Sequence, residues 1–251
     1  MTDLAAIRPK LEDLLRTCGT IALEVRANHD RRVKPDGSLV TKADQQIEDF
    51  LHAELPKLVP GTRVWGEEHG HQSPGESGLW LVDPVDGTTN YSFGSPLWGT
   101  SIGLLQQGTI TLGGMILPEL REIYSAHSQG GATLNGKALP PVRPGDIDRT
   151  ELVSYAEDTL LAYPTADIPG KMRYNGAFVV EAAFMAKGAF RGLISQRANL
   201  YDIAASVVIL QELGAEFRQV TGEAIDLEWV AQHGRMPGPF VIFPAGNTFR
   251  V

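Results

Sequence analysis

Residues 82–91 (VDPVDGTTNY) contain the side chains best placed for chemistry. Asp83 and Asp86 lie three positions apart, with Pro84 stiffening the link between them and Gly87 allowing a sharp turn. Both carboxylates can therefore face one cation. Residues 88–90 favour a helix start, where free backbone N–H groups can bind phosphate. The competing interpretation is that the two acids only shape a turn.

Two further acids are candidates for the same site. Glu67 follows the apolar residues of a VW run, and its distance from Asp83 along the chain predicts a hairpin of neighbouring strands. Asp202 lies at a predicted helix start behind Tyr201. The four carboxylates, Glu67, Asp83, Asp86 and Asp202, could then converge on one site.

Three segments carry a family resemblance. Residues 66–68 (GEE), 83–90 (DPVDGTTN) and 201–206 (YDIAAS) resemble the signatures of the inositol monophosphatase family of magnesium-dependent, lithium-sensitive phosphomonoesterases. The first two match fully, whereas Tyr201 stands for the family's Trp and Ser206 for its final Gly. Residues 36–44 and 130–139 also match, so the resemblance covers most of the chain.

The resemblance implies a metal centre with two or three Mg²⁺ ions. Glu67, Asp83 and the Val85 carbonyl would bind one Mg²⁺, and Asp83 would bridge to a second ion held by Asp86 and Asp202. Such a pair clamps the attacking and leaving oxygens and makes a bound water more acidic.

The resemblance also implies roles in catalysis and substrate binding. Thr88 would pair with Asp44, and with Glu67 they would orient and deprotonate the attacking water. From the residues alone, Asp44 is a first-turn acid that complements a helix dipole. Lys34 matches a basic position near an outer metal or phosphate, although a solvated loop lysine is the alternative. The implied substrate contacts are Asp86, Gly87, Thr88, Gly176, Ala177, Ser195 and Asp202.

The implied function is hydrolysis of a small phosphomonoester by a metal-activated water. Ala177 and Ser195 stand where the inositol pattern has a hydroxyl and an acid, so histidinol phosphate, fructose bisphosphate and 3′-nucleotides stay open as substrates. An aspartyl-phosphate phosphatase is a rival, but its loop has one residue fewer between the two aspartates. A catalytically silent binding or regulatory homologue is the rival from another class.

The elements that position these residues follow from periodicity. Apolar stripes predict helices over 9–28 and between Thr41 and Pro56, and 31–39 is expected to be an exposed loop. Short β-rich runs after Gly78 predict a largely antiparallel sheet, followed by alternating strands and helices. The resemblance implies an α-β-α-β-α sandwich, α+β or α/β in class. We expect an N-terminal subdomain over 1–145 and a C-terminal subdomain over 146–251.

Composition limits the partners. The chain has 30 acidic and 22 basic residues, which argues against a nucleic-acid polymer or an anionic membrane as a partner. A single cysteine, Cys18, lies on an apolar stripe, and a cytoplasmic protein is expected. The resemblance implies a homodimer acting on a small phosphorylated metabolite. His69 and His71 are expected to be solvated, and Glu68 to face away from the metals.

Overall fold

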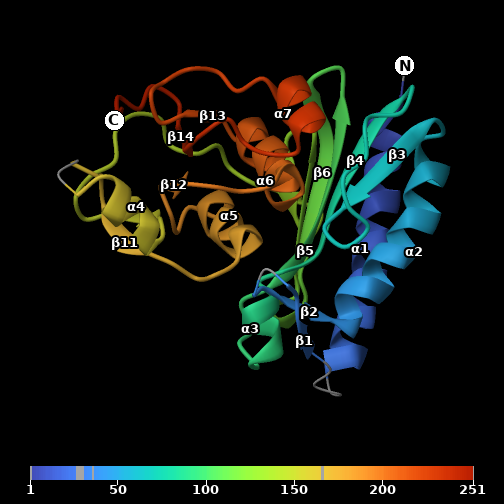
Figure 1. Cartoon of the computed structure of the whole chain (residues 1–251). Coiled ribbons are helices and arrows are strands. Elements are labelled where there is room, and N and C mark those ends of the chain that lie inside the picture. The colour runs from blue at the N-terminus through green and yellow to red at the C-terminus, as the bar shows by residue number, and fades with distance from the viewer. Residues whose placement is uncertain (1, 27–30, 36, 165–166, 251) are drawn as a thin grey trace.

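The computed structural model describes residues 2–26, 31–35, 37–164 and 167–250. A pair of helices, a seven-stranded sheet, a second pair of helices, a five-stranded sheet and the short helix α4 (Glu157–Ala162) follow one another across the molecule (Figure 1). The predicted α-β-α-β-α sandwich is therefore confirmed.

The seven-stranded sheet has the order β3-β4-β5-β6-β7-β8-β9. Neighbouring strands are antiparallel except β3 and β4, which run parallel. The strands are β3 Thr62–Gly66, β4 Gly78–Asp86, β5 Gly99–Gln106, β6 Thr109–Leu117, β7 Glu122–His127, β8 Ala132–Leu134 and β9 Lys137–Ala138. The antiparallel character predicted after Gly78 is confirmed.

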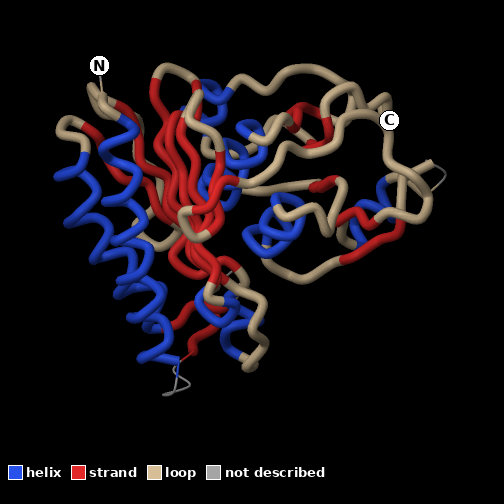
Figure 2. Tube along the Cα trace, turned by 180° about the vertical axis from the view of Figure 1, so that it is seen from behind, coloured by secondary structure: helices blue, strands red, loops and turns tan. Residues whose placement is uncertain are grey.

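Helices α1 (Leu4–Arg26) and α2 (Lys42–Leu58) cover one face of this sheet, as the view from behind also shows (Figure 2). Their apolar stripes are buried against it, with Leu11, Leu15, Cys18, Ile47, Leu51 and Leu55 fully inaccessible. The predicted core position of Cys18 is confirmed. The predicted end of the second helix before Pro56 is wrong, because α2 continues to Leu58. Pro56 costs the helix only one backbone hydrogen bond in its last turn, and buried apolar contacts hold that turn in place.

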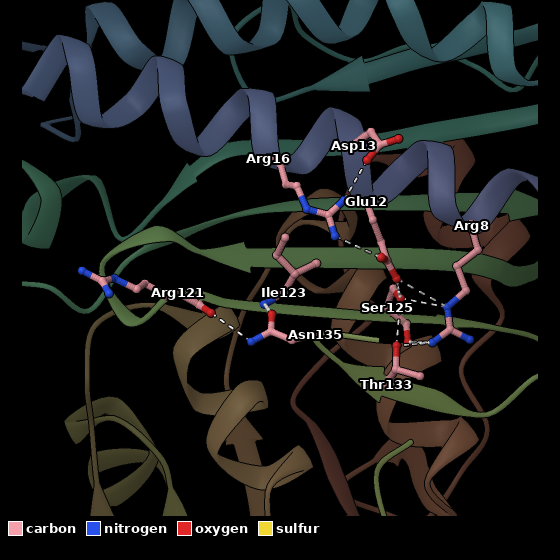
Figure 3. A network of polar contacts seen from close by, with 9 residues as sticks. All are labelled: Arg8, Glu12, Asp13, Arg16, Arg121, Ile123, Ser125, Thr133 and Asn135. Carbon is pink, nitrogen blue, oxygen red and sulfur yellow. Dashed lines mark hydrogen bonds and ion pairs between the residues drawn. The ribbon is translucent and has the colours of Figure 1, made fainter. Parts of the chain in front are cut away.

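Polar contacts fasten α1 to the far strands of the sheet (Figure 3). Arg8 donates from Nε to Ser125 Oγ at 2.8 Å, from Nη2 to the Ser125 carbonyl at 2.7 Å and from Nη1 to the Gly131 carbonyl at 3.1 Å. Ser125 Oγ also donates to Glu12 at 2.6 Å. The helix is thereby held in register with β7 and β8.

The other face of the sheet packs on helices α5 (Phe178–Ala186) and α6 (Leu200–Glu212). Both are almost completely apolar, because the second sheet covers their opposite side. That sheet has the order β11-β10-β12-β14-β13. Its strands are β10 Leu152–Ser154, β11 Lys171–Arg173, β12 Gly192–Ser195, β13 Ala215–Gln219 and β14 Phe240–Pro244.

The smaller elements complete the fold. They are β1 Arg31–Val33, β2 Leu39–Thr41, α3 Thr88–Ser92, the 3₁₀ turn Pro118–Leu120 and α7 Leu227–His233. The loop expected over 31–39 is instead an antiparallel hairpin of β1 and β2, because its proline and glycine form only the turn between two extended arms. Residues 27 and 28 of the first predicted helix lie outside the described residues.

The connection between the sheets runs from Ala138 to Leu152. The expected subdomain boundary at 145/146 falls within it and stays a prediction. No helix among the described residues is long and apolar enough to cross a membrane.

Candidate active site

Parallel pairing of β3 and β4 brings Glu67 next to Asp83. Gly66 is paired with Val82, so the next residue of each strand, Glu67 and Asp83, lies at the same end of the sheet. The predicted hairpin between them is wrong. The eleven-residue connection 67–77 carries the chain back to the end of the sheet where β3 begins, and β4 starts there, parallel to β3. Parallel strands share one carboxyl edge, whereas a hairpin would have placed the two acids at opposite ends.

A bulge in β4 turns Asp83 and Asp86 toward the same side. In a regular strand, residues three apart face opposite sides of the sheet. Here Asp83 pairs with Ser101 and Asp86 with Gly99, so β4 has one more residue than β5 across this interval. The Pro84 carbonyl accepts a hydrogen bond from Thr100 Oγ1 at 2.7 Å, which holds the bulge.

Gly87 makes the turn that follows. It has φ of 86° and caps the five-residue helix α3. A Cβ at this position would lie 2.7 Å from Cβ of Ala177, so glycine is required both by its conformation and by its surroundings. Thr88 Oγ1 donates to the Val85 carbonyl at 2.9 Å.

Asp202 reaches the site from the other half of the chain. It is the third residue of α6, where its carboxylate accepts from the Asn199 backbone N–H at 2.7 Å. Tyr201 beside it packs edge to face on Trp65, with ring centroids 5.7 Å apart. This contact connects the start of α6 to β3.

These segments enclose a cavity of about 370 Å³. The predicted site residues that line it are Glu67, Asp83, Val85, Asp86, Gly87, Thr88, Gly176, Ala177, Ser195 and Asp202. Asp158, Tyr174, Phe178, Gln196 and Arg197 also line it. Ser195 Oγ donates to the Arg197 carbonyl at 2.9 Å, so this hydroxyl already has a partner.

Three aspartates that line the cavity, Asp83, Asp86 and Asp202, have raised pKa values. Burial, then repulsion from Asp86, Glu67 and Asp202, raises the pKa of Asp83 well above its usual range. Burial and repulsion from Asp202 do the same for Asp86. Burial and repulsion from Glu67 raise the pKa of Asp202 to about 7. Carboxylates held this close favour bound cations.

The same residues fit a magnesium site. Asp83 is only 3% exposed, and its Oδ1 has no hydrogen-bond partner among the described residues. An unpaired buried carboxylate oxygen is costly unless a cation binds it. Together with Glu67, Asp86 and Asp202, it offers the hard oxygen ligands that Mg²⁺ prefers.

Asp44 lies just outside the cavity lining. It forms a capping box with Thr41 at the start of α2, and its Oδ2 accepts from Thr41 N at 2.7 Å and Thr41 Oγ1 at 2.6 Å. Its buried Oδ1 is unpaired within the described part of the chain. Burial, with repulsion from Glu67 and Glu68, raises its pKa to about 7. In this structure the hydroxyl of Thr88 bonds Val85 instead of Asp44.

Lys34 joins the two acids of the GEE segment. Its Nζ donates to Glu67 Oε1 at 2.8 Å and to Glu68 Oε1 at 2.5 Å. Burial opposes the charge on Lys34, but these two bonds outweigh it and raise its pKa. Glu68 does not line the cavity, and its expected orientation away from the metals stays a prediction.

Sequence reasoning missed Glu48, which holds the turn that carries Glu67. Glu48 is fully buried, and it accepts from the backbone N–H groups of Glu68 and His69 at 2.8 Å each. A Cβ on Gly66 would lie 2.2 Å from Glu48 Oε1, so the glycine of GEE makes room for this carboxylate. The available signal was an acid on the apolar face of α2, one turn after Asp44.

Sequence reasoning also missed Glu181, a cavity-lining acid on α5. It is 6% exposed and accepts from the Asn175 backbone N–H at 3.0 Å. Burial raises its pKa. Its position within an apolar helix was the only signal.

A profile of the inositol monophosphatase family matches residues 3–238 of this sequence. The chain belongs to the inositol monophosphatase family. An inositol-1-monophosphatase from Mesorhizobium japonicum is 32% identical over an alignment of 203 residues, and the match covers 76% of this chain and 75% of that protein. A histidinol-phosphatase from Chlorobaculum parvum is 26% identical over an alignment of 248 residues, and the match covers 95% of this chain and 96% of that protein.

Solved structures have the same fold as this inositol monophosphatase family member. One, described as an IMPase/NADP phosphatase complexed with Mg²⁺ and phosphate, is similar with a TM-score of 0.81 at 22% identity and covers 96% of this chain and 91% of that one. The resemblance drawn from the three signature segments is thus confirmed for the family and for the fold.

Proposed function

We propose that this chain is a Mg²⁺-dependent phosphatase that hydrolyses small phosphomonoesters. The observation that carries this proposal is the convergence of four acids on one cavity. Glu67 follows β3, Asp83 and Asp86 belong to β4, and Asp202 lies in the first turn of α6. Family membership supports the same chemistry.

In this proposal the four carboxylates hold two or three Mg²⁺ ions. Glu67 and Asp83 would hold one ion, and Asp83, Asp86 and Asp202 would hold a second, so Asp83 belongs to both predicted ligand sets. The Val85 carbonyl completes the first set, and its second lone pair accommodates the bond from Thr88. Bound Mg²⁺ supplies Lewis-acid stabilisation of the phosphoryl oxygens and a more acidic water.

Thr88, Asp44 and Glu67 orient the water and take up its proton. Thr88 Oγ1 is fixed by the Val85 carbonyl, which directs its lone pairs away from that bond. Asp44 has one buried oxygen without a partner among the residues described, and its pKa of about 7 suits a proton acceptor at neutral pH.

The remaining lining residues select the substrate. Gly87 and Thr88 would contact the phosphate, together with Asp86 and Asp202 through the metal ions. Gly176, Ala177 and Ser195 would surround the leaving group. A free carboxylate would accept hydrogen bonds from the hydroxyls of a polyol. Ala177 has no polar side chain, and the hydroxyl of Ser195 is already bonded, so a substrate other than inositol phosphate fits this proposal.

Location and assembly belong to the proposal too. We expect a cytoplasmic protein, supported by a single buried cysteine, and a homodimer, supported by the family resemblance. The partner is a small phosphorylated metabolite. Because its phosphate and the four carboxylates are all negatively charged, cations must lie between them.

The test is phosphate release from a panel of phosphomonoesters, with Mg²⁺ and with chelator. Asp83→Asn should abolish turnover and leave the fold intact, whereas Asp13→Asn, at an exposed position of α1, should retain it. Full activity in chelator, or in Asp83→Asn, would refute the proposal. A trapped phospho-aspartate would indicate the covalent rival, and metal binding without any turnover would indicate the silent homologue.

A further inference from the structure

A cluster of Glu48, His52 and His69 adjoins the GEE turn and does not line the cavity. Glu48 and His52 are one helical turn apart on α2, and His69 follows β3. One ligand atom from each of the three side chains lies within 4.8 Å of the others. The cluster is reachable from solvent, because the side chains of His52 and His69 are 31% and 43% exposed.

The separations suit a metal ion. Glu48 Oε1 lies 2.9 Å from His69 Nδ1 and 3.7 Å from His52 Nε2. In a tetrahedral site with bonds of about 2.0–2.1 Å, ligand atoms are about 3.3 Å apart. The two distances lie on either side of this value, so small side-chain movements would complete the coordination.

The second nitrogen of His69 has the partner expected of a metal ligand. Its Nε2 lies 3.1 Å from Asp49 Oδ1, on the side of the ring away from Glu48. A ligating histidine usually donates its other ring N–H to a carboxylate, which fixes the ring and the tautomer. His69 is therefore oriented with Nδ1 toward Glu48 and His52.

A plain hydrogen-bonded cluster does not account for His52. Such a cluster satisfies His69 in its doubly protonated form, in which one ring N–H donates to Glu48 and the other to Asp49. However, His52 Nε2 is buried and has no hydrogen-bond partner in the described part of the chain. The ring centroids of His52 and His69 are 4.5 Å apart, with the rings edge to face, and each ring has a nitrogen within 4.8 Å of the other's.

We propose that Glu48, His52 and His69 form a second cation site, which binds a transition-metal ion such as Zn²⁺ and is separate from the carboxylate cavity. Imidazole nitrogen favours Zn²⁺, Cu²⁺, Ni²⁺ and Co²⁺, whereas Mg²⁺ prefers oxygen ligands alone. A water molecule takes the fourth position. Because Glu48 also accepts from the N–H groups of Glu68 and His69, the site adjoins the turn that carries Glu67.

The test uses Co²⁺ as a coloured substitute for Zn²⁺ on the full chain. Asp83→Asn serves as the background and Mg²⁺ is kept in excess, so that the carboxylate cavity does not take up the probe. We expect one equivalent of Co²⁺ that Zn²⁺ displaces and Mg²⁺ does not. His52→Gln and His69→Gln should each weaken binding at least about 10- to 100-fold.

His71→Gln is the matched control. His71 belongs to the same segment but bonds the Ala231 carbonyl at 2.7 Å and packs on Trp65, so its loss should leave Co²⁺ affinity unchanged. Unaltered binding in His52→Gln, or displacement of Co²⁺ by Mg²⁺, would overturn the site. Anomalous diffraction from crystals soaked in Zn²⁺ tests the wild-type chain independently: a peak between the three side chains supports the proposal, and its absence refutes it.

Discussion

Replacing Asp202 by Asn should stabilise the metal-free chain, although it removes a ligand of the proposed metal site. The ordinary carboxyl pKa of 3.8 rises to about 7 at Asp202 because of burial and the nearby Glu67. Ionised Asp202 therefore costs the folded state free energy at neutral and alkaline pH. Asparagine removes the charge and keeps an oxygen that can accept from the Asn199 N–H.

The size of the effect follows from the pKa. A change of one pKa unit is worth about 1.4 kcal/mol, and the pKa of Asp202 is raised from 3.8 to about 7. At about pH 8 the ionised side chain therefore lowers the free energy of unfolding by up to about 4 kcal/mol. Since the folded pKa is raised, the wild-type chain takes up a proton and becomes more stable as the pH falls through 7. The advantage of Asp202→Asn should then shrink to about 2 kcal/mol at about pH 5.

Thermal unfolding in chelator measures this difference. For a chain of this length, about 4 kcal/mol corresponds to an increase in Tm of roughly 8–16 °C, which is an upper limit because neighbouring carboxyls share the repulsion. In saturating Mg²⁺ the wild-type chain should have the higher Tm, since it keeps every proposed metal ligand and Asp202→Asn does not.

Asp226→Asn is the matched control. Asp226 also stands at a helix start, where it accepts from the N–H groups of Glu228 and Trp229 at 3.0 Å each, but it lies outside the acidic cavity. Its replacement should be neutral or destabilising by about 1 kcal/mol at either pH. Equal effects of the two substitutions, or a gain at Asp202 that does not depend on pH, would contradict the reasoning.

Three further outcomes are expected. Thr88→Ala should lower kcat by about 10²- to 10⁴-fold with little change in Mg²⁺ affinity, and Thr88→Ser should retain most activity; an unchanged kcat in the alanine variant would assign Thr88 to helix capping. Gly66→Ala places a Cβ 2.2 Å from Glu48 and should cost about 1.5–3 kcal/mol in unfolding free energy, with reduced turnover. Gly238→Ala, whose nearest neighbour would be 3.9 Å away, should cost far less, and equal losses would disprove the steric argument. Ser195→Glu should raise kcat/KM for myo-inositol 1-phosphate by about one to two decades relative to the other phosphomonoesters, and a wild-type preference for that substrate above about tenfold would show that another group binds the polyol.

The sequence was most informative where the determinant of structure is local. The stripe of Leu11, Leu15 and Cys18 predicted α1, and the Asp-x-x-Asp-Gly spacing indicated that Asp83 and Asp86 act together. Both depend only on periodicity or on neighbouring residues. Signature segments then linked these acids to Glu67 and Asp202 through the family resemblance.

Features set by pairing between distant segments were not predictable. Whether β3 and β4 run parallel depends on the path of the connection between them, which contains no helix and no periodic pattern. The bulge that turns Asp86 to the side of Asp83 is a property of its register with β5. Glu48 carries no motif of its own, and its role depends on a turn that only the folded chain brings to it.

The docking of α1 has a consequence for synthesis of the chain. Helix α1 is made first, but its apolar stripe packs on β6 and β7, and Arg8 bonds to Ser125 and Gly131. At about 5–20 residues per second, the ribosome needs roughly 5–20 s to add the intervening residues. During that interval the apolar stripe of α1 has no sheet to pack on, so we expect this helix to be a binding site for chaperones on the nascent chain.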